Sequence, residues 1–578
     1  MLTRLCIRNF KRLDDVSIEL GRTVVLIGPN NSGKTTALQA LTLWDIGLRK
    51  WDEKRGGKEI PTKRSGVSIN RRDLSALPVP SAKLLWRDLY VRNVERPLID
   101  GKRSTKTQYI RIEITVDGVS NGVAWSQGLE FDYANDESIY CRPLGMTDSD
   151  NGQLSPLALE ALKMRVVFLP PMSGLSDREF VKEPGEIGVL IGQGQTAQVL
   201  RNLCYQLKKR DDQSEWQALT RQVERLFGVK LLDPEYIVDR SEIVMQYEER
   251  GTRLDLSCAG RGLQQTLLLL AHLALNPHSV LLLDEPDAHL EILRQRQNYR
   301  LINEIAERQG SQIIIASHSE VILNEAADRD VVIAFVGQPH RIDDRGAQVL
   351  KALRDLGFEQ YLEAEQTGWV LYLEDSTDFD ILRAFAETLN HPVREHLERP
   401  FLHYVATNLP QKARDHFYGL CEAKTDLRGV ALFDRLDREL QRGTALVETM
   451  WRRREIENYF CSEAVLLAYA RHDVPDDLFG RAEGTQRTQH MRDAIQEVSE
   501  ALETLGKPDP WSHDIKVSDE FLAPVFKRFF EKLKLPLTFR KSDYHFLARL
   551  KPAHEIDPEV IEKLDLIQKV AESAVPRR

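Results

Sequence analysis

Apolar and polar positions along the chain repeat with two different periods, and together they predict an α/β protein. From residue 2 to residue 20 apolar and polar residues alternate, which predicts two strands joined by a turn at residues 9–14. Continuous apolar runs predict buried strands of the kind found in parallel sheets. These runs cover residues 23–27, 166–169, 279–285, 312–316, 368–373 and 429–433, and residues 109–116 and 129–133 also read as strands.

Helical spacing of apolar residues predicts helices at residues 36–43, 263–275 and 379–389. Residues 195–227 have the same spacing with a break near 209–214, which predicts a helical hairpin. Residues 517–535 also have helical spacing and carry four basic side chains. They form either a helix that faces nucleic acid or a partner, or a core-packed helix with a solvated face. The run 263–283 contains His272, Asn276 and Pro277, so we expect a helix, a turn and a strand there rather than a membrane span.

Composition limits the class of protein. The 578 residues carry a net charge of −9, with 42% hydrophobic and 29% charged residues, which predicts a soluble protein of three or four domains. Residues 45–108 look like an insertion after the first helix, and within them residues 49–106 hold 16 Lys and Arg against 7 Asp and Glu, a net of +9. This stretch is either a nucleic-acid footprint or a solvated loop. The scattered cysteines and the charged start predict a reducing, cytoplasmic location.

A candidate phosphate site lies near the start of the chain. Residues 28–35 read Gly-Pro-Asn-Asn-Ser-Gly-Lys-Thr, which fits G-x-x-x-x-G-K-[ST] between a predicted strand and a predicted helix. In such a loop backbone N–H groups surround phosphates, Lys34 reaches the β and γ phosphates, and Thr35 holds Mg²⁺. The nucleotide-binding residues predicted here are Gly28, Asn30, Asn31, Gly33, Lys34, Thr35 and Thr36.

Later segments carry residues that suit nucleotide hydrolysis. Asp284 and Glu285 end a buried strand, where we expect Asp284 to support Mg²⁺ and Glu285 to polarise the attacking water. His318 follows the strand at 312–316, in position to contact the γ-phosphate. A Gly-rich segment at 256–265 opens a helix and presents Gly260 and Gly262 to an anion.

These segments, in this order, resemble an ABC-type ATPase of the SMC/RecF/OLD branch, and residues 7–11 (Ile-Arg-Asn-Phe-Lys) are similar to the opening of that branch. The resemblance covers about residues 1–345. It implies a two-lobed head whose signature loop completes the ATP site of a second copy, so that Gly260 and Gly262 would touch that copy's nucleotide. The signature segment reads A-G-R-G-L-Q-Q instead of L-S-G-G-Q.

Acidic residues also cluster in the C-terminal half, after two predicted strands and again near residue 455. Such clusters bind hard cations, and two ions can stabilise the attacking and leaving oxygens of a phosphodiester displacement. The candidate metal ligands are Glu374, Asp378, Asp434, Asp437 and Glu457. The alternative is that Asp434 and Asp437 cap helices and that Glu455 and Glu457 form surface ion pairs.

The same acids resemble a TOPRIM domain of the OLD nuclease type, whose pattern is a glutamate with an acid four residues on, then D-x-D, then a further glutamate. Glu374 and Asp378 match the first element, Asp434 the first acid of the second, and Glu457 the third. The resemblance implies that Lys541 corresponds to a late lysine that neutralises transition-state charge.

Two departures from this pattern stand out. The D-x-D is D-x-x-D here, and because side chains alternate along a strand, the extra residue points Asp437 elsewhere unless a turn compensates. Asp375 stands where the family usually has a glycine.

We therefore expect an ABC-type P-loop ATPase domain at residues 1–345, with a helical insertion or dimerisation segment at about 190–240. A linker at 346–367, a TOPRIM-like α/β domain at 368–470 and a mostly helical region at 471–578 would follow. The activity that the resemblance implies is an ATP-regulated, Mg²⁺-dependent nuclease acting on DNA or RNA in anti-phage defence, with Mn²⁺ or Ca²⁺ as alternatives at the second site. The other hypothesis is an ATP-driven sensor or scaffold that holds or releases a separate effector. Either would form a homodimer or higher homo-oligomer through its heads, answer to an effector or phage-derived trigger protein, and have no membrane segment.

Overall fold

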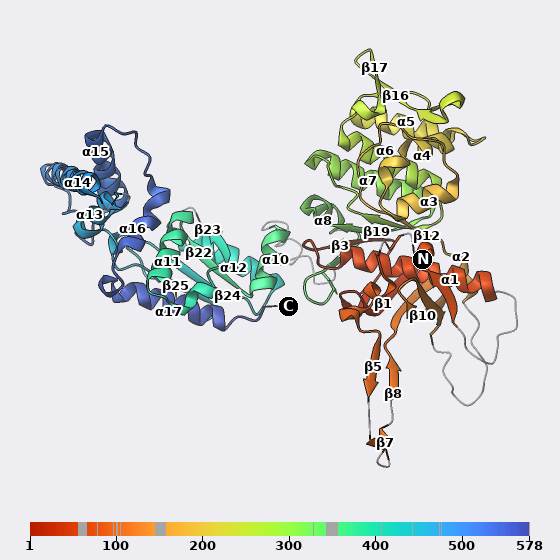
Figure 1. Cartoon of the computed structure of the whole chain (residues 1–578), viewed down its shortest axis with the longest axis horizontal. Helices are drawn as coiled ribbons and strands as arrows, with labels where there is room; N and C mark the ends of the chain where they lie inside the picture. The colour runs from red at the N-terminus through yellow and green to blue at the C-terminus, as the bar shows by residue number, and fades with distance from the viewer. Residues whose placement is uncertain are drawn as a thin grey trace. The chain divides into compact units, whose positions relative to one another are not determined.

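The chain divides into two units, residues 1–350 and residues 351–578, and each has its own sheets and core (Figure 1). The computed structural model describes residues 1–55, 66–74, 76–77, 79–95, 98–99, 102–103, 106–144, 158–327, 329–342, 357–405, 407–441, 443–472, 474–475 and 477–576. The first half of the linker expected at 346–367 lies outside these residues, and most of its second half is a helix, α10 (Phe358–Thr367).

A six-stranded sheet lies at the centre of the first unit. Its order is β12 (Val166–Leu169), β18 (Val280–Asp284), β19 (Gln312–Ser317), β3 (Thr23–Ile27), β20 (Val331–Ala334) and β21 (His340–Arg341), of which β21 is antiparallel. The predicted strands of this sheet are confirmed, and their Val, Ile and Leu side chains are buried. The carboxyl ends of β18, β19 and β3 lie side by side, with Asp284 opposite Ala316 and Ser317 opposite Ile27.

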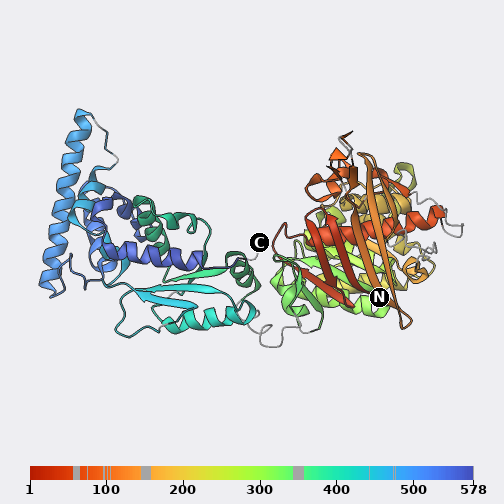
Figure 2. The same ribbon diagram turned by 90° about the horizontal axis from the view of Figure 1, so that it is seen from below.

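Helix α1 (Lys34–Arg55) lies between this sheet and a second, antiparallel sheet, and in Figure 2 it crosses behind the antiparallel strands. The second sheet has the order β2 (Leu13–Glu19), β1 (Leu2–Phe10), β9 (Ile112–Ser120), β10 (Val123–Asn135), β11 (Ser138–Pro143) and β4 (Val67–Asn70). The prediction that the helix ends at residue 43 was wrong. The helix extends beyond residue 43 because polar side chains one turn apart pair with each other. Arg49 donates a hydrogen bond to Asp45, four residues earlier, at 3.2 Å.

Helices form the rest of the first unit. They are α2 (Leu159–Lys163), α3 (Pro184–Gly192), α4 (Leu200–Lys208), α5 (Ser214–Phe227), α6 (Arg261–Leu275), α7 (Ile292–Gln309) and α8 (Glu320–Ala326). The break between α4 and α5 confirms the predicted hairpin. Short strands then fill residues 230–255: β13 (Lys230–Leu231), β14 (Glu235–Ile237), β15 (Glu242–Val244), β16 (Gln246–Glu249) and β17 (Thr252–Asp255).

The basic stretch at residues 49–106 is only partly described. A hairpin of β5 (Arg92–Glu95) and β8 (Lys106–Tyr109), with β6 (Leu98–Ile99) and β7 (Lys102–Arg103) near its tip, extends from the unit (Figure 1). Residues 56–65 lie outside the described residues. Elsewhere several basic side chains have acidic partners: Lys50 pairs with Asp73, Arg71 with Glu137, and Arg87 with Asp14. Those charges are neutralised within the fold.

A four-stranded parallel sheet organises the second unit. Its order is β23 (Phe401–Tyr404), β22 (Trp369–Leu373), β24 (Arg428–Phe433) and β25 (Leu446–Met450). From β22 the chain adds β23 on one side and β24 on the other. The strand order therefore reverses beside β22, and at such a point the carboxyl ends of parallel strands frame a crevice. Glu374 and Asp434 directly follow β22 and β24.

Helices cover both faces of this sheet and continue beyond it. They are α10 (Phe358–Thr367), α11 (Ser376–Thr388), α12 (Pro410–Ala423), α13 (Glu463–Arg471), α14 (Leu478–Thr504), α15 (Ala523–Leu533), α16 (Tyr544–Leu550) and α17 (Pro558–Glu572). One hydrophobic core runs from Trp369 to Ala571. Helix α15 buries Phe526, Phe529 and Phe530 in it, which confirms the core-packed interpretation of residues 517–535.

The α/β fold class with a helical region at the end is confirmed. Among the described residues, no helix combines the length and the apolar character needed to cross a bilayer.

Candidate nucleotide site and carboxylate cluster

The predicted phosphate loop joins β3 to α1 and lines a cavity of ≈ 760 Å³. The lining residues are Arg12, Asn30, Asn31, Ser32, Gly33, Lys34, Thr35, Thr36 and Glu285. Gly33 has a φ of +108°, a backbone conformation that glycine adopts without steric cost. Lys34 Nζ donates to the carbonyl oxygens of Gly28 at 2.7 Å and Pro29 at 2.8 Å, which holds the ammonium inside the loop.

Thr35 and Asp284, the two residues predicted for Mg²⁺, are in direct contact. Thr35 Oγ1 donates to Asp284 Oδ1 at 3.0 Å. Burial raises the pKa of Asp284 to about 6, although the Thr35 hydrogen bond opposes this rise. Burial also lowers the pKa of Lys34, against the opposing effect of Glu285 and Asp284.

These residues fit a magnesium nucleotide. The Ser32 hydroxyl inside the loop is buried and has no hydrogen-bond partner among the described residues. A phosphate oxygen would accept from it, and the opposite charges of cation and phosphates would offset the burial of Asp284 and Lys34.

Glu285 and His318 meet beside the loop. Glu285 has a φ of +47°, a left-handed conformation that costs a non-glycine residue about 1–2 kcal/mol. Its N–H donates to the Ala316 carbonyl at 2.8 Å, which ties this turn to β19. His318 Nδ1 lies 3.4 Å from Glu285 Oε1. Backbone strain of this kind gathers at functional sites, and here it aims the predicted catalytic carboxylate at the cavity.

The signature-like segment lies at the start of α6, away from the chain's own phosphate loop. Gly260 is the N-cap of α6 and is exposed, and none of residues 256–265, all of which are described, lines the loop cavity. Asp255, the residue just before this segment, accepts hydrogen bonds from Ser257 N at 2.8 Å and from Arg201 Nη2 at 3.1 Å. These bonds hold the start of the segment in place. Contact of Gly260 and Gly262 with a second copy's nucleotide stays a prediction.

In the second unit, acids from three separate segments influence one another at the carboxyl end of the sheet. Burial raises the pKa of Asp434 to about 8, and Asp378, Glu455 and Glu374 add to the rise. Burial raises the pKa of Asp378 to about 7, with further contributions from Asp375 and Glu374. We call Glu374, Asp378, Asp434, Glu455 and Glu457 the carboxylate cluster.

Glu455 and Glu457 are the most buried members of the cluster, at 2% and 1% exposed, so the interpretation of both as surface ion pairs was wrong. Burial and the Glu455 charge raise the pKa of Glu457 well above its ordinary value, while Lys541 opposes this. Glu455 accepts hydrogen bonds from Ser518 N and, at 3.0 Å, from Ser518 Oγ.

Lys541 reaches the cluster from the helical region. Its Nζ lies 3.8 Å from Glu457 Oε1 and 3.6 Å from Asp375 Oδ2. Burial opposes its charge, but Glu457 and Asp375 raise the pKa of Lys541 overall. The lysine named by the family resemblance thus faces these acids, and the charge of Lys516 also acts on Glu455.

Asp437 does not share the burial of the cluster. It is exposed in the loop after β24, and it makes no hydrogen bond or ion pair within the part of the chain that the structure describes. No helix follows Asp434 among described residues 435–441 and 443–445, so the interpretation of Asp434 and Asp437 as helix caps was wrong. In the described ranges, no group of three or more His, Cys, Asp or Glu side chains is arranged to hold a metal ion.

Three residues were missed from the sequence. Arg12, in the turn between β1 and β2, lines the nucleotide cavity, and no local motif marks it. Asp375 caps α11 by accepting hydrogen bonds from Thr377 N and Asp378 N, which the sequence Asp-Ser-Thr-Asp signals as a capping pattern. Ser518 has no sequence signal, since only the fold brings it to Glu455.

Comparisons with known proteins match the two halves of the nucleotide site. A family model described as an AAA ATPase domain matches residues 1–45, which contain the phosphate loop. A second, described as "AAA domain, putative AbiEii toxin, Type IV TA system", matches residues 199–324, which contain Gly260, Asp284, Glu285 and His318.

An OLD nuclease of Thermus scotoductus (strain ATCC 700910 / SA-01) is 46% identical over 43 residues, which are 7% of this chain and 8% of that protein. An SMC head domain from Thermotoga maritima has 15% identity and a TM-score of 0.32, covering 59% of this chain and 98% of its own. The Smc head domain from Pyrococcus furiosus, bound to the C-terminal domain of ScpA, has 13% identity and a TM-score of 0.32, covering 59% and 96%.

The chain is an ATPase of the P-loop class. Two family models cover the phosphate loop and the acidic pair, and the structure brings these segments to one edge of one sheet.

Proposed function

We propose that this chain is an ATP-regulated nuclease whose nucleic-acid-cutting site is the carboxylate cluster. One observation carries the proposal: acids from three separated segments, two of them fully buried, raise one another's pKa where the strand order of a parallel sheet reverses. Like charges are costly to bury together, and such perturbed groups gather at functional sites.

Divalent cations would offset this cost. Glu374, Asp434 and Glu457 would hold Mg²⁺ or Mn²⁺, because carboxylate oxygens are the ligands that hard cations prefer. When bound, the cation stabilises charge on the phosphodiester and lowers the pKa of an attacking water. Lys541, 3.8 Å from Glu457, would neutralise further charge on the phosphate, and Asp375 would hold α11 and Asp378 in place. The similarity to an OLD nuclease over 43 residues supports the class of activity, not the roles of these particular residues.

ATP would act on the first unit. Lys34 and the N–H groups of the loop would bind phosphates, Thr35 and Asp284 would hold Mg²⁺, and Glu285 would accept a proton from the attacking water. The exposed segment at Gly260 would complete the site of a second copy, so ATP would close a homodimer. Regulation of the nuclease would follow from this closure.

A second function, an ATP-driven scaffold with a degenerate acid site, is favoured by two other observations. The described side chains show no three-ligand arrangement for a metal ion, and Asp437 is exposed in the loop after β24. In that case Lys541 would be a permanent internal counter-ion for Glu457 and Asp375.

Cleavage of nucleic acid separates the two functions. The full chain is incubated with supercoiled plasmid and, separately, with RNA, in Mg²⁺ or Mn²⁺, with and without ATP. We expect cleavage by the wild type, loss of about 10²-fold or more in Asp434→Asn, and wild-type cleavage in Asp437→Asn. The two variants make the same chemical change three residues apart, one inside the cluster and one exposed.

The outcomes are distinct. Intact plasmid and RNA at high protein concentration would refute the nuclease and leave the scaffold. Cleavage that survives Asp434→Asn would show that another site, or a contaminant, cuts. ATP hydrolysis measured in the same samples confirms that the first unit is folded in each variant.

A further inference from the structure

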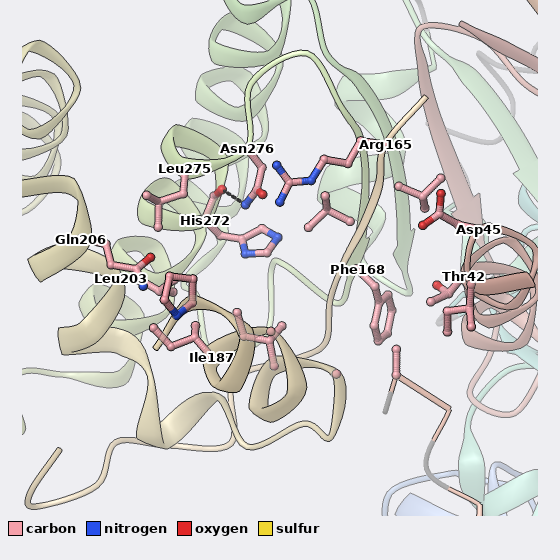
Figure 3. A pocket seen from close by; sticks show the side chains of 18 of the residues that line it. Thr42, Asp45, Arg165, Phe168, Ile187, Leu203, Gln206, His272, Leu275 and Asn276 are labelled. Atoms are coloured by element: carbon pink, nitrogen blue, oxygen red, sulfur yellow. Dashed lines mark hydrogen bonds between the residues drawn. The ribbon is translucent and has the colours of Figure 1, made fainter. Parts of the chain in front are cut away.

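The first unit contains a second cavity, separate from the phosphate loop. It has a volume of ≈ 540 Å³, within the range of small-molecule sites, and lies between α1, β12, α3, α4 and the end of α6 (Figure 3). None of the residues that line it belongs to the phosphate loop or to the carboxylate cluster. No role in nucleotide hydrolysis explains its side chains.

His272, from α6, forms part of the cavity wall and is 2% exposed. Both of its ring nitrogens are buried without a hydrogen-bond partner among the described residues. Burial, reinforced by the nearby Arg165 charge, lowers the pKa of His272 to about 4, so the ring is neutral and offers one donor and one acceptor. Buried polar groups in folded proteins nearly always have partners, so this ring points to a ligand or ordered water in the cavity.

Arg165 supplies positive charge at the same end. Its guanidinium extends from the start of β12 toward Asn276 and His272 (Figure 3), and it makes no hydrogen bond or ion pair with another described side chain. Across the cavity, Asp45 is held by Arg49 at 3.2 Å and accepts a backbone hydrogen bond from Val166. The charge of Arg165 also acts on Asp45, but the direct ion pair of this acid is with Arg49.

The remaining wall is mixed: Thr42, Asp73, Gln206 and Arg210 also line it, and apolar side chains cover the part that faces β12, α3 and α4. Phe168, Ile187 and Leu203 face the space from β12, α3 and α4 (Figure 3). We propose that this cavity binds a small organic anion with an apolar, preferably aromatic, body: its acidic group pairs with Arg165 beside His272, and its body packs on Phe168 and Ile187. This site would be a second ligand site of the ATPase unit, independent of whether the carboxylate cluster cuts nucleic acid.

Two matched probes test the two parts of the proposal, the acidic group and the aromatic body of the ligand. Indole-3-acetate carries the ring and a carboxylate, and tryptophol carries the same ring with an uncharged hydroxyl. Titrated calorimetrically into the full chain, indole-3-acetate is expected to bind with a Kd of about 1 mM or tighter, and tryptophol about tenfold more weakly. Arg165→Gln should remove the difference between the two probes.

Glycines of α3 provide a blocking variant and its control. Gly188 lines the cavity and Gly185 does not, and a Cβ at either position meets no atom within 4 Å. Gly188→Phe should fill the cavity and abolish binding of both probes, whereas Gly185→Phe should leave binding unchanged. Retained ATP hydrolysis and an unchanged melting temperature show that each variant is folded.

Three results would overturn the proposal. Failure of both probes to bind at about 5 mM would rule out a site of this class. Wild-type binding by Gly188→Phe would place the probes elsewhere. Equal binding of the two probes, or a preference for the carboxylate that survives Arg165→Gln, would remove the anion from the assignment.

Discussion

The burial of His272 has a measurable consequence for stability. Because the pKa of the ring falls from 6.5 to about 4 on folding, the unfolded chain binds a proton between these values that the folded chain does not. Folding stability from this group is fully present above pH 6.5 and is lost as the pH falls toward 4. The substitution His272→Leu removes the titrating ring, so the variant should not lose this part of its stability.

The size of the effect follows from the two pKa values. The full change corresponds to about 3.4 kcal/mol, of which about 2.5 kcal/mol is expressed between pH 7 and pH 4.5. Asp45 in the same cavity titrates with the opposite sign, since burial raises its pKa to about 6 and its charged form destabilises the fold as the pH rises. Wild type and variant share Asp45, so its contribution cancels in their difference. For a unit of this size the remaining difference is about 3–4 °C in Tm.

Scanning calorimetry of the full chain at pH 7, 6, 5 and 4.5 measures this difference. The transition of the first unit is the one that ATP shifts to higher temperature. We expect the Tm of His272→Leu to rise relative to wild type by about 3–4 °C as the pH falls from 7 to 4.5. A gap that stays constant over this range would mean that His272 titrates alike in the folded and unfolded chain, and the ring would then be solvated rather than buried.

Three further predictions test the two units separately. Lys34→Ala should weaken ATP binding about 10- to 100-fold in a nucleotide-binding assay, while Lys50→Ala on the same helix should not, and equal losses would contradict the phosphate role of Lys34. Glu285→Gln should slow ATP hydrolysis by about 10²-fold or more with ATP affinity retained, and unchanged turnover would exclude Glu285 as the base. Arg414→Met leaves the Glu448 carboxylate, 2% exposed, without its cation and should destabilise the second unit by about 3–5 kcal/mol by calorimetry, a loss that surface pairing would not produce.

The buried strands could be predicted from the sequence because both faces of a parallel strand are apolar. β3, β18 and β19 are short apolar runs rich in Val, Ile and Leu, and their short length separates them from the longer buried helix α6, which also contains four consecutive leucines. The end of α1 could not be predicted in this way. This helix packs between two sheets, so it has no single apolar stripe, and its polar residues Asp45 and Arg49 resemble the start of a loop.

The candidate sites divide in the same way. The sequence could place the main residues of the nucleotide site because they follow strands whose apolar pattern is visible in the sequence. These residues are Lys34 and Thr35, after β3, and Asp284 and Glu285, at the end of β18. The exposure of Asp437 could not be predicted from the sequence. Asp437 lies beyond the end of β24, so its direction depends on the loop and not on the alternation of side chains along the strand.

Two residues of the helical region of the second unit, Ser518 and Lys541, contact the carboxylate cluster. Ser518 donates two hydrogen bonds to Glu455, and Lys541 supplies the positive charge nearest to Glu457. Without these groups, two buried carboxylates would lose their compensation, and removing one partner of a buried charge costs about 3–5 kcal/mol. The sheet that positions Glu374 and Asp434 shares one hydrophobic core with these helices, from Trp369 to Ala571. No periodicity relates Glu457 to Lys541 along the chain, so their meeting is a property of tertiary packing alone. The acids near residue 455 are therefore buried parts of the folded core rather than remnants on a surface.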